Sequence, residues 1–290
     1  MTERLTQFTS EGLVFDVVDA GPLDGPVVIA LHGFPQTSAV WAQVTPVLTD
    51  AGYRVLAPDQ RGYSPGARPQ AVSSYTLDHL GADVLALADA AGAERFSLLG
   101  HDWGAVVSWA LAGSRPERVR TLTAVSVPHP SAFARSFAGS QLLRSWYMGA
   151  FQLPALPELV LRAGGGRALR AFLTAGAMPD PEPAVRLFAD RRAATAALNW
   201  YRALRLPAEL EAGLIRVPTL YVWSDGDTAL GRRAAEGTER FVRAPYRFVV
   251  LEGVSHWVPE ERPVELGELV VDHLLAHDGL RPASPTDPSR

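Results

Sequence analysis

Two residue types are missing from this 290-residue chain, and each absence excludes a kind of chemistry. There is no cysteine, so the protein has no disulfide, no thiolate nucleophile and no cysteine metal ligand. There is also no lysine, because all 27 basic residues are arginine. Schiff-base catalysis, lysine-bound pyridoxal phosphate and a Walker-type phosphate loop all need a lysine and are therefore excluded.

Basic charge and long apolar runs are also scarce. The net charge is −4, which predicts no basic surface for nucleic acid. No apolar run approaches the ~18 residues of a transmembrane helix, and residues 1–10 lack the charged-then-apolar pattern of a signal peptide. We expect a cytoplasmic protein with no nucleic-acid or membrane partner. The sequence leaves the oligomeric state open, with a homodimer as one possibility.

Short β-branched runs alternate with helical patterns through most of the chain. Residues 5–20 are typical of an edge hairpin, and the later apolar runs are typical of buried parallel strands. The alternation predicts a mostly parallel sheet with helices on both faces. Predicted strands cover 26–31, 53–57, 96–99, 121–127, 218–223 and 246–251, and predicted helices cover 38–48, 77–91, 105–111, 231–242 and 261–277, with Ser38 and Thr76 as N-caps of the first two.

The pattern changes between residues 129 and 212, where no strand run is found. Helical segments rich in Arg, Leu and Ala are interrupted there by prolines and by the glycines at 164–166. An insertion of this kind at a strand end commonly covers a site. We therefore predict a core domain of residues 1–128 and 213–290, a helical cap of residues 129–212, and a disordered tail at 280–290.

The stretch from 96 to 113, FSLLGHDWGAVVSWALAG, has the features of a nucleophile elbow. A short apolar strand leads into Gly100, Asp102 and Gly104, and an apolar helix pattern follows. The central residue of such a turn is held strained and exposed, and it is usually a serine. A carboxylate is already ionised at neutral pH, so Asp102 is suited to attack a saturated carbon and form an alkyl ester.

Two further candidates come directly after predicted strands. Asp227 follows the strand at 218–223, and His256 follows the strand at 246–251. Ligands of an open parallel sheet collect at the carboxyl ends of its strands, so we expect these side chains to meet Asp102 there. The chain order of nucleophile, acid and histidine is that of hydrolases with this elbow.

With these motifs in order, the chain resembles the epoxide hydrolase branch of the α/β-hydrolases over nearly its full length. The resemblance implies an α/β-hydrolase fold with a mostly parallel eight-stranded sheet flanked by helices and a helical cap inserted after the sixth strand. The matching motifs are HGFP at 32–35, DQRGYS at 59–64, GHDWGA at 100–105, SWYMGAFQLP at 145–154, LNWYR at 198–202 and GVSHWVPEERP at 253–263.

The resemblance also implies a role for each matching residue. His256 would activate the water that hydrolyses the ester, and Asp227 would orient the imidazole. Tyr147 and Tyr201, both in the cap, would donate a proton to the epoxide oxygen. The backbone N–H groups of Phe34 and Trp103 would form the oxyanion hole, and the substrate would contact Phe34, Pro35, Trp103, Trp146, Phe151, Trp200 and Trp257. No cofactor and no metal are implied.

One departure from the family leaves the acid open. The turn reads Trp-Ser-Asp-Gly-Asp at 223–227 instead of beginning Trp-Gly. Asp227 has the family spacing, and Asp225 is the alternative.

Two other patterns suggest sites that we interpret as structural. Ser64 lies in a Gly-x-Ser-x-Gly sequence, but Pro65 provides no backbone donor and no helix pattern follows. His273 and His277 have the spacing of a metal-binding pair. Without a third ligand, we assign them to a solvated helix face.

The sequence thus predicts an epoxide hydrolase that converts an apolar or aryl epoxide to a vicinal diol. Two alternatives stay open at this point. The first is a haloacid or haloalkane dehalogenase with the same aspartate nucleophile. The second is a ligand-binding relative without catalysis.

Overall fold

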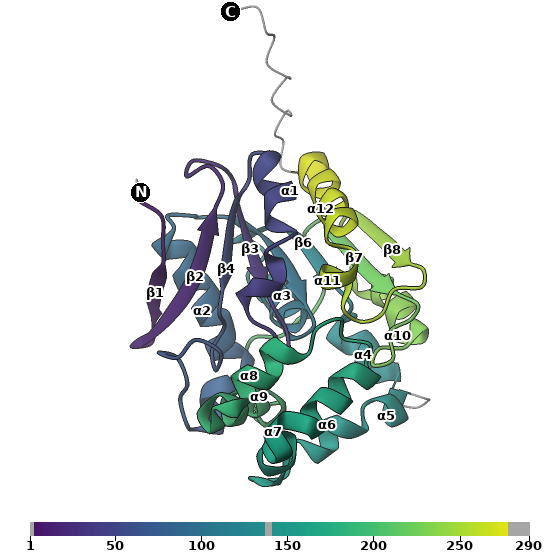
Figure 1. Cartoon of the computed structure of the whole chain (residues 1–290). Coiled ribbons are helices and arrows are strands. Elements are labelled where there is room, and N and C mark those ends of the chain that lie inside the picture. Colours follow the sequence, from purple (N-terminus) through teal and green to yellow (C-terminus); the bar gives the residue numbers. More distant parts are fainter. Residues whose placement is uncertain (1–2, 137–140, 278–290) are drawn as a thin grey trace, which may run out of the picture.

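The computed structural model describes residues 3–136 and 141–277, and the predicted tail lies outside these ranges. Within them the chain forms one sheet of eight strands in the order β1-β2-β4-β3-β5-β6-β7-β8 (Figure 1). β1 and β2 form an antiparallel hairpin, β2 is antiparallel to β4, and the remaining pairs are parallel. The strands are β1 Gln7–Ser10, β2 Leu13–Ala20, β3 Val27–Leu31, β4 Arg54–Pro58, β5 Phe96–His101, β6 Val119–Val125, β7 Thr219–Ser224 and β8 Tyr246–Leu251.

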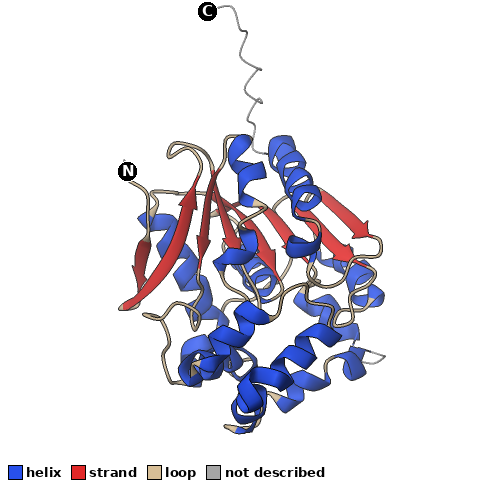
Figure 2. Ribbon diagram, in the orientation of Figure 1, coloured by secondary structure: helices blue, strands red, loops and turns tan. Residues whose placement is uncertain are grey.

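Helices cover both faces of this sheet, and a further group lies beyond its carboxyl edge (Figure 2). The helices are α1 Thr45–Asp50, α2 Leu77–Ala90, α3 Trp103–Ser114, α4 Pro130–Ser136, α5 Gln141–Arg144, α6 Trp146–Ala150, α7 Leu156–Ala175, α8 Glu182–Ala189, α9 Arg191–Ala203, α10 Arg232–Gly237, α11 Val258–Glu261 and α12 Pro263–His277, with short 3₁₀ helices at Ser38–Trp41, Val72–Tyr75 and Thr238–Phe241.

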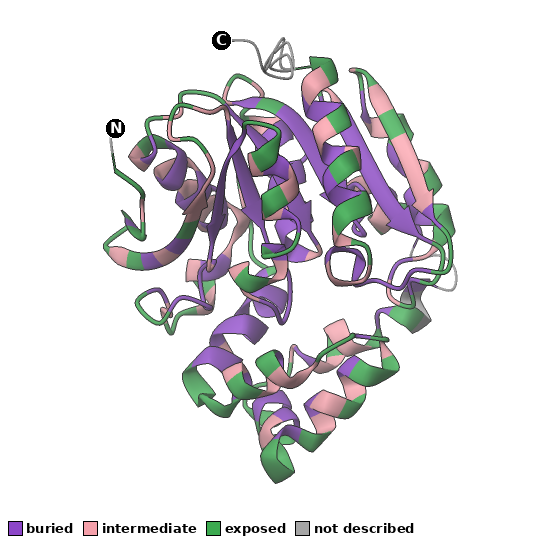
Figure 3. Cartoon of the chain, turned by 45° about the horizontal axis from the view of Figure 1, so that its top comes forward, coloured by how far each residue is buried: buried purple, intermediate pink, exposed green. Residues whose placement is uncertain are grey.

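Successive residues of a strand face opposite sides of the sheet, which divides the core into two parts. On one side, Ile29 and Leu31 of β3 pack with α2 and α3. On the other side, Val28 and Ala30 pack with α1 and α12. β3, β4, β5 and β7 are buried at every position, as expected for strands covered on both faces (Figure 3). The prediction of a parallel sheet with helices on both faces is confirmed.

The helices α4 to α9 lie between β6 and β7 in the chain, so the insertion follows the sixth strand as expected. The helices α6 to α9 lie below the carboxyl edge of the sheet in Figure 1. Non-helical backbone at residues 163–166, with three glycines at positive φ, divides α7 into two segments. α4 instead packs against α10 of the core. The limits of a separate cap domain stay a prediction.

Two predicted helices are interrupted and a third begins later than predicted, and each difference has a local cause. Pro46 has no N–H to donate, so 38–48 forms a 3₁₀ turn and then α1. Thr37, not Ser38, caps that turn, and Thr76 makes no side-chain cap bond. α10 ends at Gly237, because glycine is a poor helix former. Pro263 separates α11 from α12, because the residue before a proline disfavours helical backbone.

The assignment of His273 to a solvated helix face is wrong. Its side chain is buried, because α12 turns that face toward the sheet, whereas His277, one turn further along, is exposed. Burial lowers the pKa of His273 to about 4, and the positive charge of His277 adds to this effect. His273 is therefore a neutral core histidine.

Candidate active site

The turn between β5 and α3 has the geometry of a nucleophile elbow. Asp102 lies between them with φ 52° and ψ −118°, outside the regions that residues with a side chain prefer. A Cβ atom at Gly100 would collide with the carbonyl of Gly104, and one at Gly104 would collide with the carbonyl of Leu31. The two glycines are needed because strand and helix come this close, so the strand–turn–helix prediction is confirmed.

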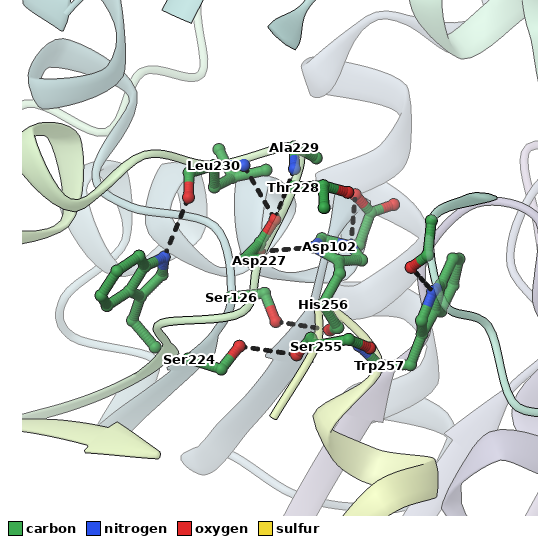
Figure 4. A network of polar contacts seen from close by, with 12 residues as sticks. Asp102, Ser126, Ser224, Asp227, Thr228, Ala229, Leu230, Ser255, His256 and Trp257 are labelled. Carbon is green, nitrogen blue, oxygen red and sulfur yellow. Dashed lines mark hydrogen bonds and ion pairs between the residues drawn. The ribbon is translucent and has the colours of Figure 1, made fainter. Parts of the chain in front are cut away.

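Asp102, His256 and Asp227 are brought together at the carboxyl edge of the sheet (Figure 4). His256 Nε2 lies 3.5 Å from Asp102 Oδ2, and His256 Nδ1 lies 2.8 Å from Asp227 Oδ2. Asp227 Oδ1 accepts hydrogen bonds from the backbone N–H groups of Ala229 at 2.7 Å and Leu230 at 2.8 Å. The Asp227 carboxylate is therefore held in place, and its hydrogen bond to Nδ1 fixes the orientation of the His256 imidazole.

The charges of these groups are strongly coupled. Burial lowers the pKa of the His256 imidazole, but the Asp227 and Asp102 carboxylates outweigh it and raise the pKa to about 10. Burial raises the pKa of Asp102, whereas His256 and the Phe34 N–H more than offset this and keep it below the ordinary value. At neutral pH the resting site therefore holds an ionised Asp102 beside an imidazolium.

The structure separates the two candidate acids at 225 and 227. Asp225 is exposed, and its carboxylate accepts a hydrogen bond from the backbone N–H of Gly253 at 2.7 Å. Only Asp227 reaches His256. The geometry thus favours Asp227, in agreement with its spacing.

Asp227→Asn should lower kcat by about 10²- to 10⁴-fold, because the amide holds the imidazole in the wrong tautomer and removes the charge that stabilises the imidazolium. Asp225→Asn, two residues away, is the matched control and should leave kcat near the wild-type value. Steady-state kinetics with one epoxide checks both variants. Loss of activity in Asp225→Asn with an active Asp227→Asn would reverse the assignment.

One of the two predicted oxyanion donors, the backbone N–H of Phe34, contacts the Asp102 carboxylate directly. The Phe34 N–H donates to Asp102 Oδ1 at 2.7 Å. The preceding residue must be a glycine, because a Cβ at Gly33 would collide with the Asp102 side chain. The Trp103 N–H is in the first turn of α3, where backbone N–H groups have no acceptor within the helix. Its part in the oxyanion hole stays a prediction.

A cavity of about 300 Å³ opens above Asp102 and His256, between the sheet and the cap helices. Tyr147 of α6 and Tyr201 of α9 both line it, with ring centroids 6.1 Å apart. Burial raises the pKa of both phenols above the ordinary value, and nearby negative charge raises it further, so both hydroxyls are protonated. The other lining residues are Phe34, Arg144, Trp146, Phe172, Leu173, Ala175, Gly176, Thr228, Ala229 and Trp257.

Four of the seven predicted substrate contacts lie outside this lining: Pro35, Trp103, Phe151 and Trp200. The Trp200 indole is buried, and its N–H donates to the Arg61 carbonyl at 2.8 Å. Trp103 packs edge-on against Trp200 and Tyr201. Phe151 packs behind Tyr147 and Tyr201. These aromatic side chains support the cavity wall instead of forming its surface.

Sequence reasoning missed the lining residues of α7. Phe172 and Leu173 face the cavity, and the Gly176 carbonyl accepts a hydrogen bond from the Trp257 indole at 2.8 Å. No motif marks this segment, and the only available signal was its apolar spacing.

Ser64, in the second Gly-x-Ser-x-Gly sequence, is structural. It is fully buried, its hydroxyl donates to the Asp59 carbonyl at 2.8 Å, and it accepts from the Asp16 N–H at 2.9 Å.

Within residues 3–136 and 141–277, no group of three or more His, Asp or Glu side chains is placed to hold a metal ion. In the same part of the chain, no helix is long and apolar enough to cross a membrane. A groove of about 1140 Å³, larger than the cavity above Asp102, lies between α7 and α9 and contains none of the three triad residues.

The chain is similar to known proteins of the alpha/beta hydrolase fold over most of its length. A family model described as the alpha/beta hydrolase fold matches residues 26–263. The AB hydrolase superfamily protein YfhM of Bacillus subtilis is 35% identical over 274 residues, covering 91% of this chain and 96% of that protein. Epoxide hydrolase A of Mycobacterium tuberculosis is 33% identical, covering 94% of this chain and 97% of that protein.

Two solved structures are also similar to this chain over nearly its full length. One described among novel epoxide hydrolases from metagenomes of hot environments has a TM-score of 0.83 at 31% identity, and covers 96% of this chain and 100% of that one. Epoxide hydrolase A from Mycobacterium thermoresistibile has a TM-score of 0.78 at 31% identity, with 96% and 98% covered.

Proposed function

Given that this chain belongs to the α/β-hydrolase fold and, within it, to the epoxide hydrolase family, and is therefore a hydrolase, we propose that it converts an apolar or aryl epoxide to a vicinal diol through a covalent ester on Asp102. The observation that carries the proposal is the cavity itself. An ionised carboxylate lies at its floor and two protonated tyrosines lie in its wall. Nucleophile and acid thus line the same space for the epoxide.

In the first step, Asp102 Oδ2 attacks an epoxide carbon. A carbon–oxygen bond forms to the carboxylate, the ring carbon–oxygen bond breaks, and a tyrosine hydroxyl gives its proton to the ring oxygen. Oδ1 is held by the Phe34 N–H at 2.7 Å, whereas Oδ2 has the longer contact of 3.5 Å with His256, so we assign the attack to Oδ2. The product of this step is a hydroxyalkyl ester of Asp102.

In the second step, water attacks the carboxyl carbon of that ester. His256 takes one proton from the water, and negative charge develops on Oδ1, where the Phe34 N–H already donates. The bond from the carboxyl carbon to Oδ2 then breaks, and His256 protonates the leaving alkoxide oxygen. The second proton of the water is left on the Asp102 carboxyl group, which returns it to His256, so the resting carboxylate and imidazolium are restored and one water and one epoxide give one diol.

The electrostatics of His256 fit this order of events. The imidazole is a cation in the resting site because two carboxylates act on it. Ester formation removes the charge of Asp102 and leaves only Asp227 beside the ring, so the pKa of His256 falls. After the ester has formed, the histidine can therefore give its proton to the tyrosinate left by the first step and act as a base toward water.

Two tryptophans near the cavity are poorly placed to bind a halide, whereas Trp146 lies in the lining. Release of halide needs N–H donors that face the leaving group. The indole N–H groups of Trp200 and Trp257 instead donate to the carbonyls of Arg61 and Gly176. The tyrosine hydroxyls are suited to protonate an oxygen, which a halide does not require.

The direct test compares the three hypotheses in one experiment. Purified protein is incubated separately with styrene oxide and with chloroacetate, and diol and chloride are measured. Diol formation without chloride release supports the proposal. Chloride release without diol would identify a dehalogenase, and binding of several epoxides without turnover would identify a ligand-binding relative.

Replacing both tyrosines tests the acid half of the mechanism. Tyr147→Phe and Tyr201→Phe should each slow ester formation, and the double variant should slow it by about 10²- to 10⁴-fold, because no acid is left for the ring oxygen. Stopped-flow tryptophan fluorescence during a single turnover measures that step. Tyr246→Phe, on β8 outside the cavity lining, is the control and should match the wild type. An unchanged rate in the double variant would remove the tyrosines from the mechanism.

A further inference from the structure

The two tyrosines of the cavity wall are carried by different helices, and each helix ends soon after its tyrosine. Tyr147 lies in α6, which ends at Ala150. Tyr201 lies in α9, which ends at Ala203. The last four carbonyl groups of an α-helix have no N–H donor within the helix. The carbonyls of Met148 and Tyr201 belong to these last turns, so each depends on a donor from outside its helix.

The side chain of Gln152 supplies both donors. Its Nε2 atom lies 2.8 Å from the carbonyl oxygen of Tyr201 and 3.3 Å from that of Met148. An amide NH₂ group has two protons, so it can donate to both carbonyls at once. These two hydrogen bonds link the ends of the two helices that carry the tyrosines.

The two carbonyls also determine which way the amide is turned. A carbonyl oxygen only accepts hydrogen bonds, so the NH₂ group of Gln152 must face both of them. The Oε1 atom of Gln152 is buried, and no residue of the described ranges donates a hydrogen bond to it. A buried acceptor without a donor is uncommon in proteins. The amide keeps this orientation because turning it would place Oε1 against two other acceptors.

The backbone on both sides of Gln152 is held by one arginine of α9. Arg202 donates to the carbonyl of Phe151 at 3.1 Å and to that of Leu153 at 2.8 Å. Arg202 is itself buried, and its guanidinium binds both carboxylate oxygens of Glu158, at 2.7 and 2.9 Å. The segment that carries Gln152 is therefore bound to α9, and the amide has little freedom to leave its two carbonyls.

The same segment packs against both tyrosine rings. The Phe151 ring lies edge-on to the rings of Tyr147 and Tyr201, with centroids 5.7 and 5.1 Å away. Gln152 lines the outer groove between α7 and α9 and is absent from the lining of the cavity above Asp102. Any influence of its side chain on the reaction therefore passes through the helices and not through contact with the substrate.

We propose that Gln152 is a positioning residue for the acid pair, and that its NH₂ group fixes Tyr147 and Tyr201 relative to one another by binding the end of each helix. The proposal rests on the function proposed above, in which a tyrosine protonates the epoxide oxygen. Proton transfer needs donor and acceptor at hydrogen-bond distance, and a displacement of about 1 Å can cost about 10²-fold in rate. Loss of the two hydrogen bonds lets the helix ends separate, which slows ring opening and leaves ester hydrolysis unchanged.

The decisive variant is Gln152→Met, because methionine has a similar length and no N–H donor. We expect ester formation to slow by about tenfold to a hundredfold, with little change in the dissociation constant of the epoxide. Ester hydrolysis should keep the wild-type rate, since Asp102 and His256 belong to the core and not to the linked helices. Gln70→Met is the matched control, because Gln70 is an exposed glutamine that lines the same groove, and it should behave like the wild type.

A cycle of variants separates positioning of the tyrosines from a general loosening of the cap helices. In the double variant Tyr147→Phe and Tyr201→Phe no acid is left to position, so adding Gln152→Met should change the rate of ester formation by less than about twofold. Single-turnover fluorescence with styrene oxide measures each rate, and thermal unfolding verifies that each variant is folded. Equal slowing in both backgrounds, or a wild-type rate in Gln152→Met alone, would overturn the proposal.

A measurement without substrate distinguishes failure of this proposal from failure of the proposed function. In ¹³C NMR of protein labelled at the tyrosine ring carbon that bears the hydroxyl, the resonances of Tyr147 and Tyr201 are assigned by their loss in the two Phe variants. Both should shift in Gln152→Met and in Gln152→Asn, whose stem is too short to bridge the carbonyls, while Tyr246 on β8 stays unchanged. Unchanged Tyr147 and Tyr201 resonances would contradict the positioning role even if styrene oxide is hydrolysed. Shifted resonances without hydrolysis would support the positioning of the rings and reject the proposed function.

Discussion

Replacing Asp102 with alanine abolishes diol formation, with kcat lower by about 10⁴-fold or more, because the variant has no nucleophile to form the ester. The side chain has no substitute within reach. Asp227 bonds to His256 and to two backbone N–H groups, and it cannot also attack the substrate. Asp225→Ala removes a nearby exposed carboxylate and is the control, with activity expected near that of the wild type.

The measurement for Asp102→Ala is diol production over hours at high enzyme concentration, with thermal unfolding as the check on folding. Residual activity at one per cent of wild type would mean that water attacks the epoxide directly. In that case the tyrosines and His256 would suffice, and the covalent mechanism would be wrong.

Replacing His256 with glutamine stops the reaction halfway. Ester formation needs Asp102 and the tyrosines, which this substitution leaves in place, whereas hydrolysis needs a base for the attacking water. We expect hydrolysis to slow by about 10²- to 10⁴-fold, so that the alkyl-enzyme accumulates. Intact mass spectrometry should find one equivalent of protein heavier by the mass of one epoxide, and peptide mapping should place the added mass on Asp102.

His101→Gln is the matched control, which shows whether adduct accumulation is specific to the loss of His256. His101→Gln changes the neighbouring imidazole, which is not part of the cavity lining. The His101 ring hydrogen-bonds to the His256 carbonyl and to Gln36, and it packs against the rings of His256 and Trp257. This variant should reduce turnover without accumulating ester, since the base is retained. If His256→Gln neither turned over nor accumulated an adduct, His256 would be required for the first step as well.

The sheet and the elbow were predictable because their causes are local. The apolar runs of β3, β4, β5 and β7 are typical of strands covered on both faces, and these strands are buried at every position. Gly100 and Gly104 have no room for a side chain, so the spacing around Asp102 reports the close approach of strand and helix directly. The carboxyl ends of parallel strands share one edge, which brought Asp227 and His256 to the same place.

The cavity wall was less predictable because it depends on how each cap helix is rotated. Trp200 and Tyr201 are adjacent in α9, and neighbouring residues of a helix point about 100° apart. Only one of them can face the cavity, and it is Tyr201, while the Trp200 indole donates to the Arg61 carbonyl. Nothing in the LNWYR sequence decides between the two.

The contacts around His101 lie outside any local pattern. The Gln36 side chain hydrogen-bonds to Glu260, 224 residues away in the sequence, and to His101, 65 residues away. Each residue type is common in loops, and the hydrogen bonds that connect them depend on three separate strand ends. Such a chain becomes visible only when the fold has been built.

The covalent mechanism is tested most directly by a single turnover in ¹⁸O-labelled water with enzyme in excess over epoxide. Because water attacks the carboxyl carbon of the ester, the diol should leave with an oxygen of Asp102 and carry no label. One ¹⁸O should then appear in the peptide that contains Asp102. Label in the diol, with none in Asp102, would contradict the account.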